Sequence, residues 1–260
     1  MLNKFDKLKK YLNELKKQGL CLAFSGGIDS TLLLFLCQDM DIIAITLKTD
    51  FQTFEEIELT KKLCQKYNIK QLIIEADVLE NPLINNNPKN RCYECKKFLF
   101  KTAVQKAFEH GKKYLIDGTN FDDLNTHRPG IKALEELEII SPFAKFGITK
   151  KEIREYAKEC GIEIYDKPST PCLATRFPYN TKLTKQNLQM TEQGEVILKK
   201  YGYKNCRFRI HGNIARIEIP PEQFDSFIKE KTGLIKDIKA LNIKYVTLDL
   251  EGMRSGSMDI

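Results

Sequence analysis

Three of the eight cysteines lie in polar surroundings where a thiolate could bind a metal or react. Cys92 and Cys95 form a Cys-x-x-Cys pair between an Asn- and Pro-rich loop, residues 81–90, and a helix predicted to start near Phe98. Such a pair can hold one metal centre, but closed zinc sites need further Cys or His ligands, and the chain has three histidines and no second Cys pair. With Cys172, three thiolates suit an iron–sulfur cluster better. Taken alone, the pair is also compatible with a redox dithiol or chance spacing.

Cys172 lies in a segment, residues 167–179, whose prolines exclude regular structure and predict a shaped loop between two domains. Lys167 and Arg176 flank the thiol in that loop, and their charges would favour its thiolate form. A cubane cluster normally takes four cysteines, so three would leave one iron without a protein ligand. That iron could hold a substrate sulfur.

A second site is expected where an apolar strand, residues 21–24, meets a helix through small residues. Glycines there let the backbone approach a ligand closely, and the free amides of a helix beginning at Asp29 would point at it, as in sites that bind phosphate. A tight turn with an ordinary helix cap is the alternative. The residues expected to hold the phosphates are Ala23, Ser25, Gly26, Gly27, Asp29, Ser30 and Thr31.

The surrounding elements predict how this loop is positioned. Apolar runs predict strands that alternate with amphipathic helical patterns, so we expect an α/β fold with a parallel sheet and flanking helices. The strands are expected at 22–24, 42–47, 71–74, 114–116 and 138–140, and the helices at 32–40, 54–67, 98–110 and 150–160. Ligands of such sheets bind beyond the carboxyl ends of the strands. Ser25, Lys48 and Asp117 each follow a predicted strand and are expected on that rim.

The pattern changes near Pro178 to that of a small α+β domain. A helix is expected at 183–201, strands at 205–211 and 213–219, then two helical segments and a last strand at 244–250. We therefore divide the chain into a first domain at 1–166, an inter-domain loop at 167–182 and a second domain at 183–260.

The first two strands of the second domain carry a basic face. Strict alternation places Arg207, Arg209 and His211 on one side of the first strand, and Arg216 follows on the second. From alternation alone, a solvated face without function is the more ordinary interpretation.

Composition limits the class of protein. The chain has 260 residues and a net charge of +7, with basic residues spread among acidic ones, so anionic ligands are favoured and nucleic acid is allowed but not demanded. No run is long enough to cross a membrane, and residues 1–19 read as a charged amphipathic helix rather than a signal peptide, so we expect a cytoplasmic protein. The five remaining cysteines have apolar or helix-end settings and are expected to be structural.

Several motifs taken together resemble known families. Ser-Gly-Gly-x-Asp-Ser at residues 25–30 resembles the signature of the ATP pyrophosphatase (PP-loop) family. The whole set resembles the LarE family, the sulfur-inserting enzymes of nickel-pincer cofactor synthesis. The residues that carry this resemblance are 25–30, 91–96, 117–120, 128–130, 172–179, 214–218 and 252–256.

The resemblance implies a reaction. Members of the family use ATP to adenylate the carboxylates of a pyridinium-3,5-dicarboxylate mononucleotide and convert them to thiocarboxylates, releasing AMP and pyrophosphate. One branch sacrifices its own cysteine, and another holds a 4Fe–4S cluster on three cysteines. Cys172 matches the cysteine of both branches. Because the sacrificial branch lacks the pair Cys92 and Cys95, the resemblance favours the cluster branch, with a sacrificial Cys172 as the alternative.

The resemblance also implies site residues. Mg²⁺ would be held partly by Asp29 and by Asp122 or Asp123. Lys96, Gly118, Arg128 and Arg176 would bind the cofactor, with Arg176 in the loop of the reactive cysteine. The arginines expected to hold the substrate phosphate or carboxylates are Arg207, Arg209, Arg216 and Arg254.

Three other functions stay open, one of which is an ammonia-using ligase of the same superfamily, although no glutaminase domain is visible in this sequence. PP-loop enzymes with iron–sulfur clusters also thiolate transfer RNA, although the RNA-binding module or zinc ribbon usual in those relatives is not visible in this sequence. A non-catalytic protein that senses nucleotide or stores metal is the third. The family resemblance suggests a homo-oligomer, such as a hexamer, and leaves the sulfide donor unidentified.

Overall fold

The computed structural model describes residues 3–125, 129–168, 170–254 and 257 of the 260-residue chain. The chain divides into two compact units. The first consists of Met1–Val78 and Asn90–Thr170, and the second of Leu79–Lys89 and Pro171–Ile260. Because the short segment Leu79–Lys89 belongs to the second unit, the chain passes from one unit to the other three times.

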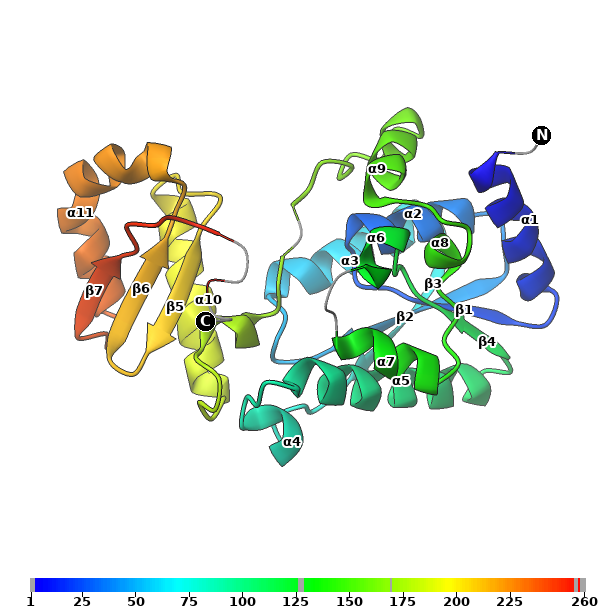
Figure 1. Ribbon diagram of the computed structural model, residues 1–260, viewed down its shortest axis with the longest axis horizontal. Helices are drawn as coiled ribbons and strands as arrows, with labels where there is room; N and C mark the ends of the chain where they lie inside the picture. The colour runs from blue at the N-terminus through cyan, green and yellow to red at the C-terminus, as the bar shows by residue number, and fades with distance from the viewer. Residues whose placement is uncertain (1–2, 126–128, 169, 255–256, 258–260) are drawn as a thin grey trace. The chain divides into compact units, whose positions relative to one another are not determined.

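A four-stranded parallel sheet forms the centre of the first unit and confirms the predicted α/β class (Figure 1). Its strands are β1 (Leu20–Ala23), β2 (Ile42–Lys48), β3 (Lys70–Glu75) and β4 (Tyr114–Ile116), in the order β3-β2-β1-β4. The chain builds outward from β1 to β3 and then returns to place β4 on the other side of β1. The strand order thus reverses at the carboxyl end of β1, where sheets of this kind bind ligands.

The fifth strand predicted for this sheet, at residues 138–140, does not form. Only an isolated bridge joins Ile140 to Ile116. Glu138 has a left-handed backbone (φ 53°), and Pro142 begins a helix soon after, so the chain between them is too short to continue a ladder.

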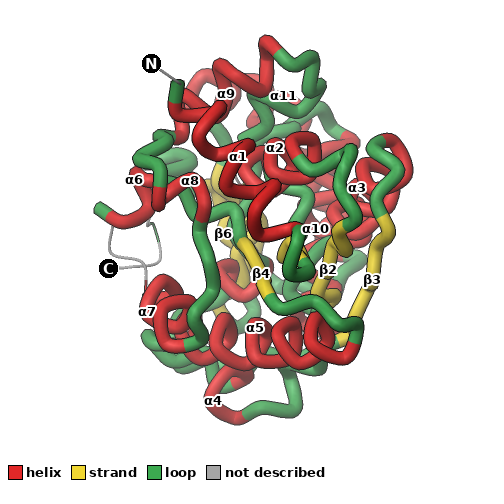
Figure 2. Tube along the Cα trace, turned by 90° about the vertical axis from the view of Figure 1, so that its right-hand side faces the viewer, coloured by secondary structure: helices red, strands yellow, loops and turns green. Residues whose placement is uncertain are grey.

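Helices cover both faces of the sheet. They are α1 (Lys4–Lys16), α2 (Ile28–Leu36), α3 (Phe54–Lys66), α5 (Arg91–Glu109), α6 (Phe121–Leu124), α7 (Pro129–Glu136), α8 (Pro142–Lys145) and α9 (Lys150–Glu159). Figures 1 and 2 show α5 and α7 on one face and α1, α2 and α9 on the other. None of the helices in the described ranges is both long enough and apolar enough to cross a lipid bilayer.

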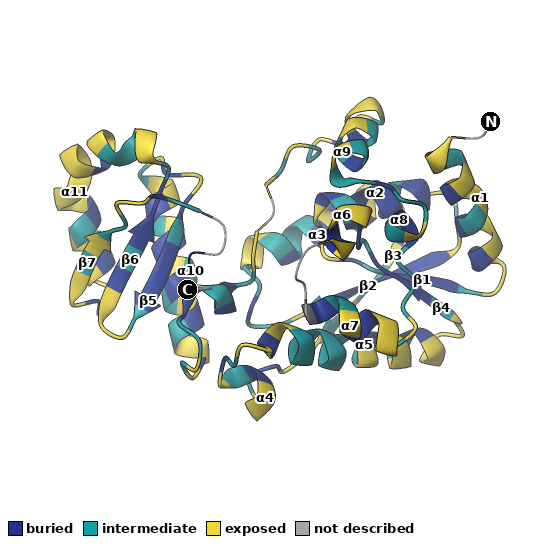
Figure 3. Cartoon of the chain, in the orientation of Figure 1, coloured by how far each residue is buried: buried dark blue, intermediate teal, exposed yellow. Residues whose placement is uncertain are grey.

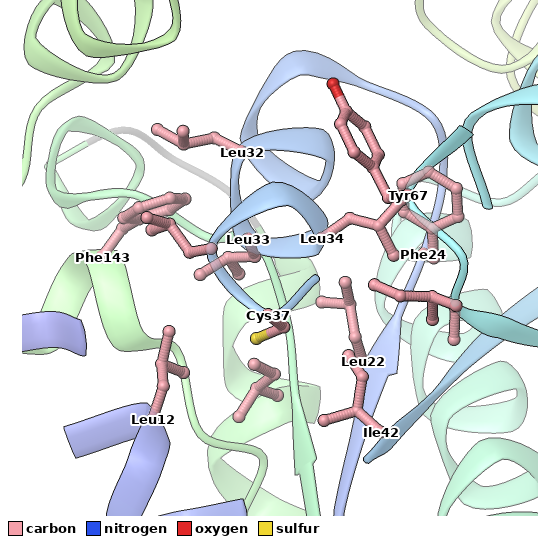
Figure 4. Close-up of a cluster of buried hydrophobic side chains, with 14 of the residues drawn as sticks. Leu12, Leu22, Phe24, Leu32, Leu33, Leu34, Cys37, Ile42, Tyr67 and Phe143 are labelled. Atoms are coloured by element: carbon pink, nitrogen blue, oxygen red, sulfur yellow. The ribbon is translucent and has the colours of Figure 1, made fainter. Parts of the chain in front are cut away.

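Alternating side chains of β1 enter two separate cores. Leu20 and Leu22 pack with residues of α1, α2, α3 and α9, while Cys21 packs against Ala103 and Ala107 of α5. Figure 4 shows the larger core, to which Leu22 of β1 and the three leucines Leu32, Leu33 and Leu34 of α2 all contribute. In Figure 3 the central strands β1 and β2 are dark blue along most of their length, whereas no residue of the edge strand β3 is buried. The helix that follows the phosphate loop is therefore fixed by one of the most buried parts of the unit.

Helix α5 begins at Arg91, so the predicted start near Phe98 is wrong. The apolar periodicity does begin near Phe98, because residues 92–97 are mostly polar and have no buried face to reveal a helix. Asn90 occupies the N-cap position. Cys92 and Cys95 consequently lie in the first turns of a 19-residue helix, not in a loop.

The second unit has a small sheet and two long helices, as the sequence predicted. Its elements are α4 (Pro82–Asn85), η1 (Leu173–Arg176), α10 (Lys185–Lys200), β5 (Arg207–His211), β6 (Ile214–Glu218), η2 (Pro221–Gln223), α11 (Phe224–Lys239) and β7 (Tyr245–Leu248). The sheet order is β5-β6-β7, with β5 and β6 antiparallel and β6 and β7 parallel. Phe208 of β5 packs directly on Gly194 of α10, where a β-carbon would lie 2.5 Å from the ring.

The segment Leu79–Lys89 is tied to the second unit by backbone hydrogen bonds. The amide of Asn180 donates to the carbonyl of Asn87 over 2.9 Å. The amide of Leu183 donates to the carbonyl of Asn85 over 2.7 Å. Asn87 is fully buried and left-handed, with a φ of 53°. An eleven-residue excursion of the chain is thus a structural part of the second unit.

Candidate active site

The loop between β1 and α2 contains a left-handed glycine and leaves the start of α2 without a side-chain cap. Gly26 has a φ of +73°, which L-residues rarely adopt, and Gly27 is the N-cap of α2 without a side-chain capping bond. Ser30 Oγ donates to the carbonyl of Gly27 over 3.0 Å and lies 3.2 Å from Ser25 Oγ. Two hydroxyl groups and the start of a nine-residue helix therefore converge on the same point.

A cavity of about 330 Å³ opens at this loop within the first unit. Its lining includes the apolar residues Phe24, Ile45, Leu47, Leu99 and Phe100. The predicted residues that line the cavity are Ala23, Ser25, Gly27, Asp29, Ser30, Lys96 and Gly118. A lining that combines apolar side chains with a polar loop suits a nucleotide, whose base is flat and apolar and whose phosphates are charged.

Asp29 joins the loop to two distant segments. One carboxylate oxygen accepts a hydrogen bond from Asn120 Nδ2 over 3.4 Å, and the other forms an ion pair with Lys150 Nζ. Lys150 is the first residue of α9, and its backbone amide donates to Asp122 Oδ2 over 2.8 Å. The carboxylate of Asp122 thus acts as a helix-end acceptor, whereas Asp123 lines the cavity.

Lys96 faces a second carboxylate of the cavity, that of Asp117. The two charged groups lie 3.8 Å apart, and Asp117 is buried. Asp117 also accepts hydrogen bonds from Thr119 Oγ1 and Ser141 Oγ, each over 2.6 Å. These bonds fix the carboxylate at the end of β4. Since Lys96 directly follows Cys95, the cysteine pair and the cavity are adjacent through one helix.

Gly118 lines the cavity, and close packing also requires a glycine at this position. A β-carbon there would lie 2.9 Å from the backbone nitrogen of Ser30 and 3.2 Å from Cβ of Asp29. The end of β4 and the start of α2 can therefore approach this closely only with glycine at residue 118.

The cysteine pair lies on one face of α5, because residues three apart on a helix are neighbours. Cys92 is exposed and Cys95 is half-buried. The guanidinium of Arg91 is almost fully buried and donates to Cys92 Sγ over 3.4 Å. A cation at hydrogen-bond distance suits a sulfur that carries negative charge.

Three described residues that were predicted for this site, Gly26, Thr31 and Lys48, are not among the residues that line the cavity. Thr31 is fully buried. Lys48 pairs with Glu75 of the neighbouring strand over 2.7 Å instead of facing the loop. Arg128 lies outside the described residues.

The predicted basic face of the second unit is largely paired with carboxylates. Arg209 and Arg216 are directly opposite each other on β5 and β6, where two like charges would repel. Glu218, which is fully buried, accepts from both: Arg209 Nε and Nη2 over 2.5 and 2.9 Å, and Arg216 Nη2 over 3.0 Å. Arg254 pairs with Glu251 over 2.5 Å. The arginines thus form a charge network within the unit.

Cys172 is half-buried at the N-cap of η1, and Arg176 ends the same turn. The guanidinium of Arg176 is fully buried and bonds to Glu195 over 2.6 Å. Arg207 lies on β5, and its Nη1 donates to the carbonyl of Cys206 over 2.7 Å. The second unit therefore holds the predicted reactive cysteine together with the predicted arginines Arg176, Arg207, Arg209, Arg216 and Arg254.

Some residues of the site could not be predicted from the sequence. Lys150 is one: Thr149 and Glu152 form a capping box that marks a helix start, but nothing in the sequence pairs Lys150 with Asp29. Gln52 and the apolar pair Leu99 and Phe100 were missed for the same reason, since they reach the cavity only through the fold.

Among the residues that the structure describes, no group of three or more His, Cys, Asp or Glu side chains is placed so that it could hold a metal ion. Cys92 and Cys95 belong to the first unit and Cys172 to the second. The three-cysteine ligand set thus stays a prediction.

Comparison with known proteins identifies the family. A model of the NAD synthase family matches residues 1–107. The uncharacterized protein slr1717 of Synechocystis is 37% identical over 99% of this chain and 97% of its own length. A solved structure, the U34-tRNA thiolase NcsA from Methanococcus maripaludis with its 4Fe–4S cluster, is 16% identical over 98% of this chain and 84% of that chain, with a TM-score of 0.48, a likeness too distant to carry an argument.

One relative has a known activity. Pyridinium-3,5-bisthiocarboxylic acid mononucleotide synthase of Lactiplantibacillus plantarum is 32% identical over 246 residues, which cover 93% of this chain and 89% of that protein. The identity extends through both units, and the cavity lies at the Ser-Gly-Gly-x-Asp-Ser loop. The chain is therefore an enzyme of the LarE family, within the PP-loop superfamily.

Proposed function

We propose that this enzyme transfers sulfur at the expense of ATP, converting the carboxylates of a pyridinium-3,5-dicarboxylate mononucleotide to thiocarboxylates for a nickel-pincer cofactor. The observation that carries the proposal is the 32% identity to the synthase over nearly the full length of both chains. The cavity at the Ser25–Ser30 loop supports it, because this chemistry needs a nucleotide.

The first step activates a carboxylate, whose oxygen is otherwise a poor leaving group. A carboxylate oxygen attacks the α-phosphorus of ATP, the bond to the bridging oxygen breaks, and pyrophosphate leaves. Amides at the start of α2 and the hydroxyls of Ser25 and Ser30 are placed to stabilise that negative charge. Lys96 lines the cavity, and Lys150 forms an ion pair with Asp29 at its loop. Both lysines would add positive charge near the phosphates.

Mg²⁺ would be held by carboxylates at the same end. Asp29 and Asp123 both line the cavity, and hard carboxylate oxygens are the donors that this ion prefers. We favour Asp123 over Asp122 as the second ligand because Asp122 accepts the first amide of α9. Bound Mg²⁺ would screen charge on the phosphates.

The second step replaces oxygen by sulfur. Sulfide attacks the acyl carbon of the adenylate, the carbon–oxygen bond to AMP breaks, and the thiocarboxylate forms. We propose that Cys92, Cys95 and Cys172 hold a 4Fe–4S cluster; when bound by three cysteines, such a cluster keeps one iron open to carry sulfide. The donor set fits, because Cys92 and Cys95 share one helix face and both reach the surface at least in part.

Chain connectivity supports the third ligand. Asn87 Nδ2 donates to the carbonyls of Phe177 and Pro178 over 3.3 and 2.8 Å. Phe177 follows Cys172 by five residues (177 − 172), and Asn87 precedes Cys92 by five (92 − 87). The covalent chain leading into the cysteine pair is thus hydrogen-bonded to the turn that follows Cys172.

The deciding experiment measures pyrophosphate release with the pyridinium dicarboxylate mononucleotide as the added carboxylate. Release should depend on that compound and should be lost in Asp29→Ala, while iron content stays unchanged. Pyrophosphate release that does not depend on the mononucleotide but increases when transfer RNA is added would instead favour RNA thiolation. Wild-type release in Asp29→Ala would refute the assignment of the loop.

Iron and acid-labile sulfide, measured on protein purified without oxygen, test the sulfur route separately. About four iron atoms per chain would support the cluster. No iron, together with loss of the mass of one H₂S from Cys172 after turnover, would show a sacrificial enzyme.

A further inference from the structure

The backbone around Cys172 is held in place by side chains from several elements. We call residues 171–178 the Cys172 turn. Within it, the amide and the Oγ1 hydroxyl of Thr175 both donate to the carbonyl of Cys172, over 3.0 and 2.8 Å. On the far side, Asn87 donates to the carbonyls of Phe177 and Pro178. The turn has no strand or long helix of its own, so its shape depends on these bonds.

Arg176 supplies the first of two buried supports. Its guanidinium folds back onto its own turn, where Nη1 donates to the carbonyl of Pro171 over 3.3 Å and to Thr175 Oγ1 over 2.8 Å. The other two nitrogens bond to both oxygens of Glu195 on α10, over 2.6 and 3.4 Å. Glu195 Oε1 also accepts the amide of Phe208 on β5 over 3.3 Å. One side chain with no exposed surface therefore links the Cys172 turn to α10 and β5.

Arg209 supplies the second support from β5. Its Nη1 donates to the carbonyl of Thr175 over 2.6 Å, while Nε and Nη2 form a two-bond contact with Glu218. Arg209 is 6% exposed and Glu218 is fully buried. Every guanidinium nitrogen of Arg176 and of Arg209 thus has an acceptor inside the unit.

Arg207 differs, although it lies on the same strand. It has no ion pair with a carboxylate among the described residues, and its hydrogen bond is to the carbonyl of Cys206. Burial, followed by the nearby charge of Arg176, lowers the pKa of Arg207. Glu218 lies opposite Arg207 on β6, but it bonds to Arg209 and Arg216. A guanidinium that forms no ion pair among the described residues can pair with an anionic ligand, whereas the charges of Arg176 and Arg209 are matched.

We propose that Arg176 and Arg209 are positioning residues that hold the Cys172 turn through Glu195 and Glu218, and that they do not bind the substrate's phosphate or carboxylates. This inference rests on the proposed role of Cys172 in sulfur transfer. It divides the arginines that the sequence grouped together: Arg207 stays a candidate for the anionic substrate, and Arg209 becomes part of the frame. Removing Arg176 would leave the buried Glu195 without its ion pair, and removing Arg209 would leave Glu218 with Arg216 as its one remaining cation among the described residues. Either change would release the turn.

The test is the rate at which iodoacetamide alkylates Cys172 in the full-length protein without substrate, followed by mass spectrometry at matched iron content. Arg176→Gln and Arg209→Gln should raise that rate on the order of tenfold, because each loses several buried charge-assisted hydrogen bonds. Arg207→Gln is the matched control on the same strand and should stay within about twofold, since it makes none of these bonds. Arg176→Lys keeps the charge but not the forked geometry and should fall between wild type and Arg176→Gln.

Cys206 serves as an internal control for folding, since it is 2% exposed in the same unit. It should stay protected in all four variants. Equal acceleration at Cys206 and Cys172 would mean that the arginines hold the whole unit, which would overturn a role specific to the turn.

Steady-state kinetics give an independent reading. The frame variants should lower kcat with little change in KM for the mononucleotide, and Arg207→Gln should raise KM. A raised KM in Arg209→Gln with unchanged Cys172 alkylation would overturn the proposal and make Arg209 a substrate ligand. If the mononucleotide proves not to be the substrate, the alkylation rates still decide whether the frame exists.

Discussion

Lys150 forms an ion pair with Asp29 although 121 residues separate them in the chain. The contact joins the start of α9 to the start of α2, and the same lysine's amide is fixed by Asp122. One positive charge is thereby held against the single carboxylate in the phosphate loop. A triphosphate approaching this loop would meet a neutralised Asp29 instead of a bare negative charge.

Lys150→Met should therefore weaken ATP use. Loss of a charge-assisted bond to Asp29 is expected to lower kcat/KM for ATP, measured by pyrophosphate release, by about tenfold or more. Lys151→Met is the matched control, because its side chain is 84% exposed and pairs only loosely with Glu155, at 3.9 Å. Equal losses in the two variants would show that the effect is one of general charge.

Cys92→Ser and Cys95→Ser should each abolish iron binding, because a cluster cannot be held by the remaining thiolates in a stable form. Iron and acid-labile sulfide per chain are the measurements. Cys160→Ser is the control: this cysteine is also partly exposed but ends α9 away from the pair in sequence, and it should keep the iron of the wild type. A full cluster in Cys92→Ser would refute the ligand set.

Alkylation across pH should separate the structural thiols from the others. Burial raises the pKa of Cys21 to about 11 and those of Cys37, Cys64 and Cys206 to about 12. Since only the thiolate reacts, these four should stay unmodified near pH 8 and gain reactivity only as the pH rises toward those values. Exposed Cys92 should react first in iron-free protein. Early labelling of Cys37 would contradict the packing of α2.

Gly118→Ala should damage the phosphate loop. The added carbon would lie 2.9 Å from the nitrogen of Ser30, so α2 or β4 must shift, at a stability cost of about 1–3 kcal/mol. We expect a lower melting temperature and loss of the stabilisation that ATP gives wild type in a thermal unfolding assay. An undiminished ATP effect would mean that the loop does not contact the phosphates.

Much of the first unit was predictable because its elements have strong local patterns. Buried strands read as continuous apolar runs, and the Ser-Gly-Gly loop has a backbone requirement that only small residues meet. The start of α5 was not predictable, because residues 92–97 show no apolar periodicity and the cysteine pair resembles a loop motif.

The arginines show where sequence reasoning stops. Alternation placed Arg209 and Arg216 on one face correctly, but it treated that face as basic. Glu218 comes two residues after Arg216 on the same side of β6, so the sequence already contained the acid that neutralises Arg209 and Arg216. The register places Glu218 opposite Arg207, and only the side-chain hydrogen bonds show that it pairs with Arg209 and Arg216. Lys150 and Asp29 likewise meet through tertiary structure alone.

The segment Leu79–Lys89 has a consequence for how such a chain can be cut or recombined. Because eleven residues of the first half are built into the second unit, neither unit is a contiguous module. A fragment ending at residue 166 would keep Asn85 and Asn87 but lose the amides of Leu183 and Asn180 that they bind. Exchange of a whole unit between homologues would need three crossover points, so the two units are expected to be inherited together.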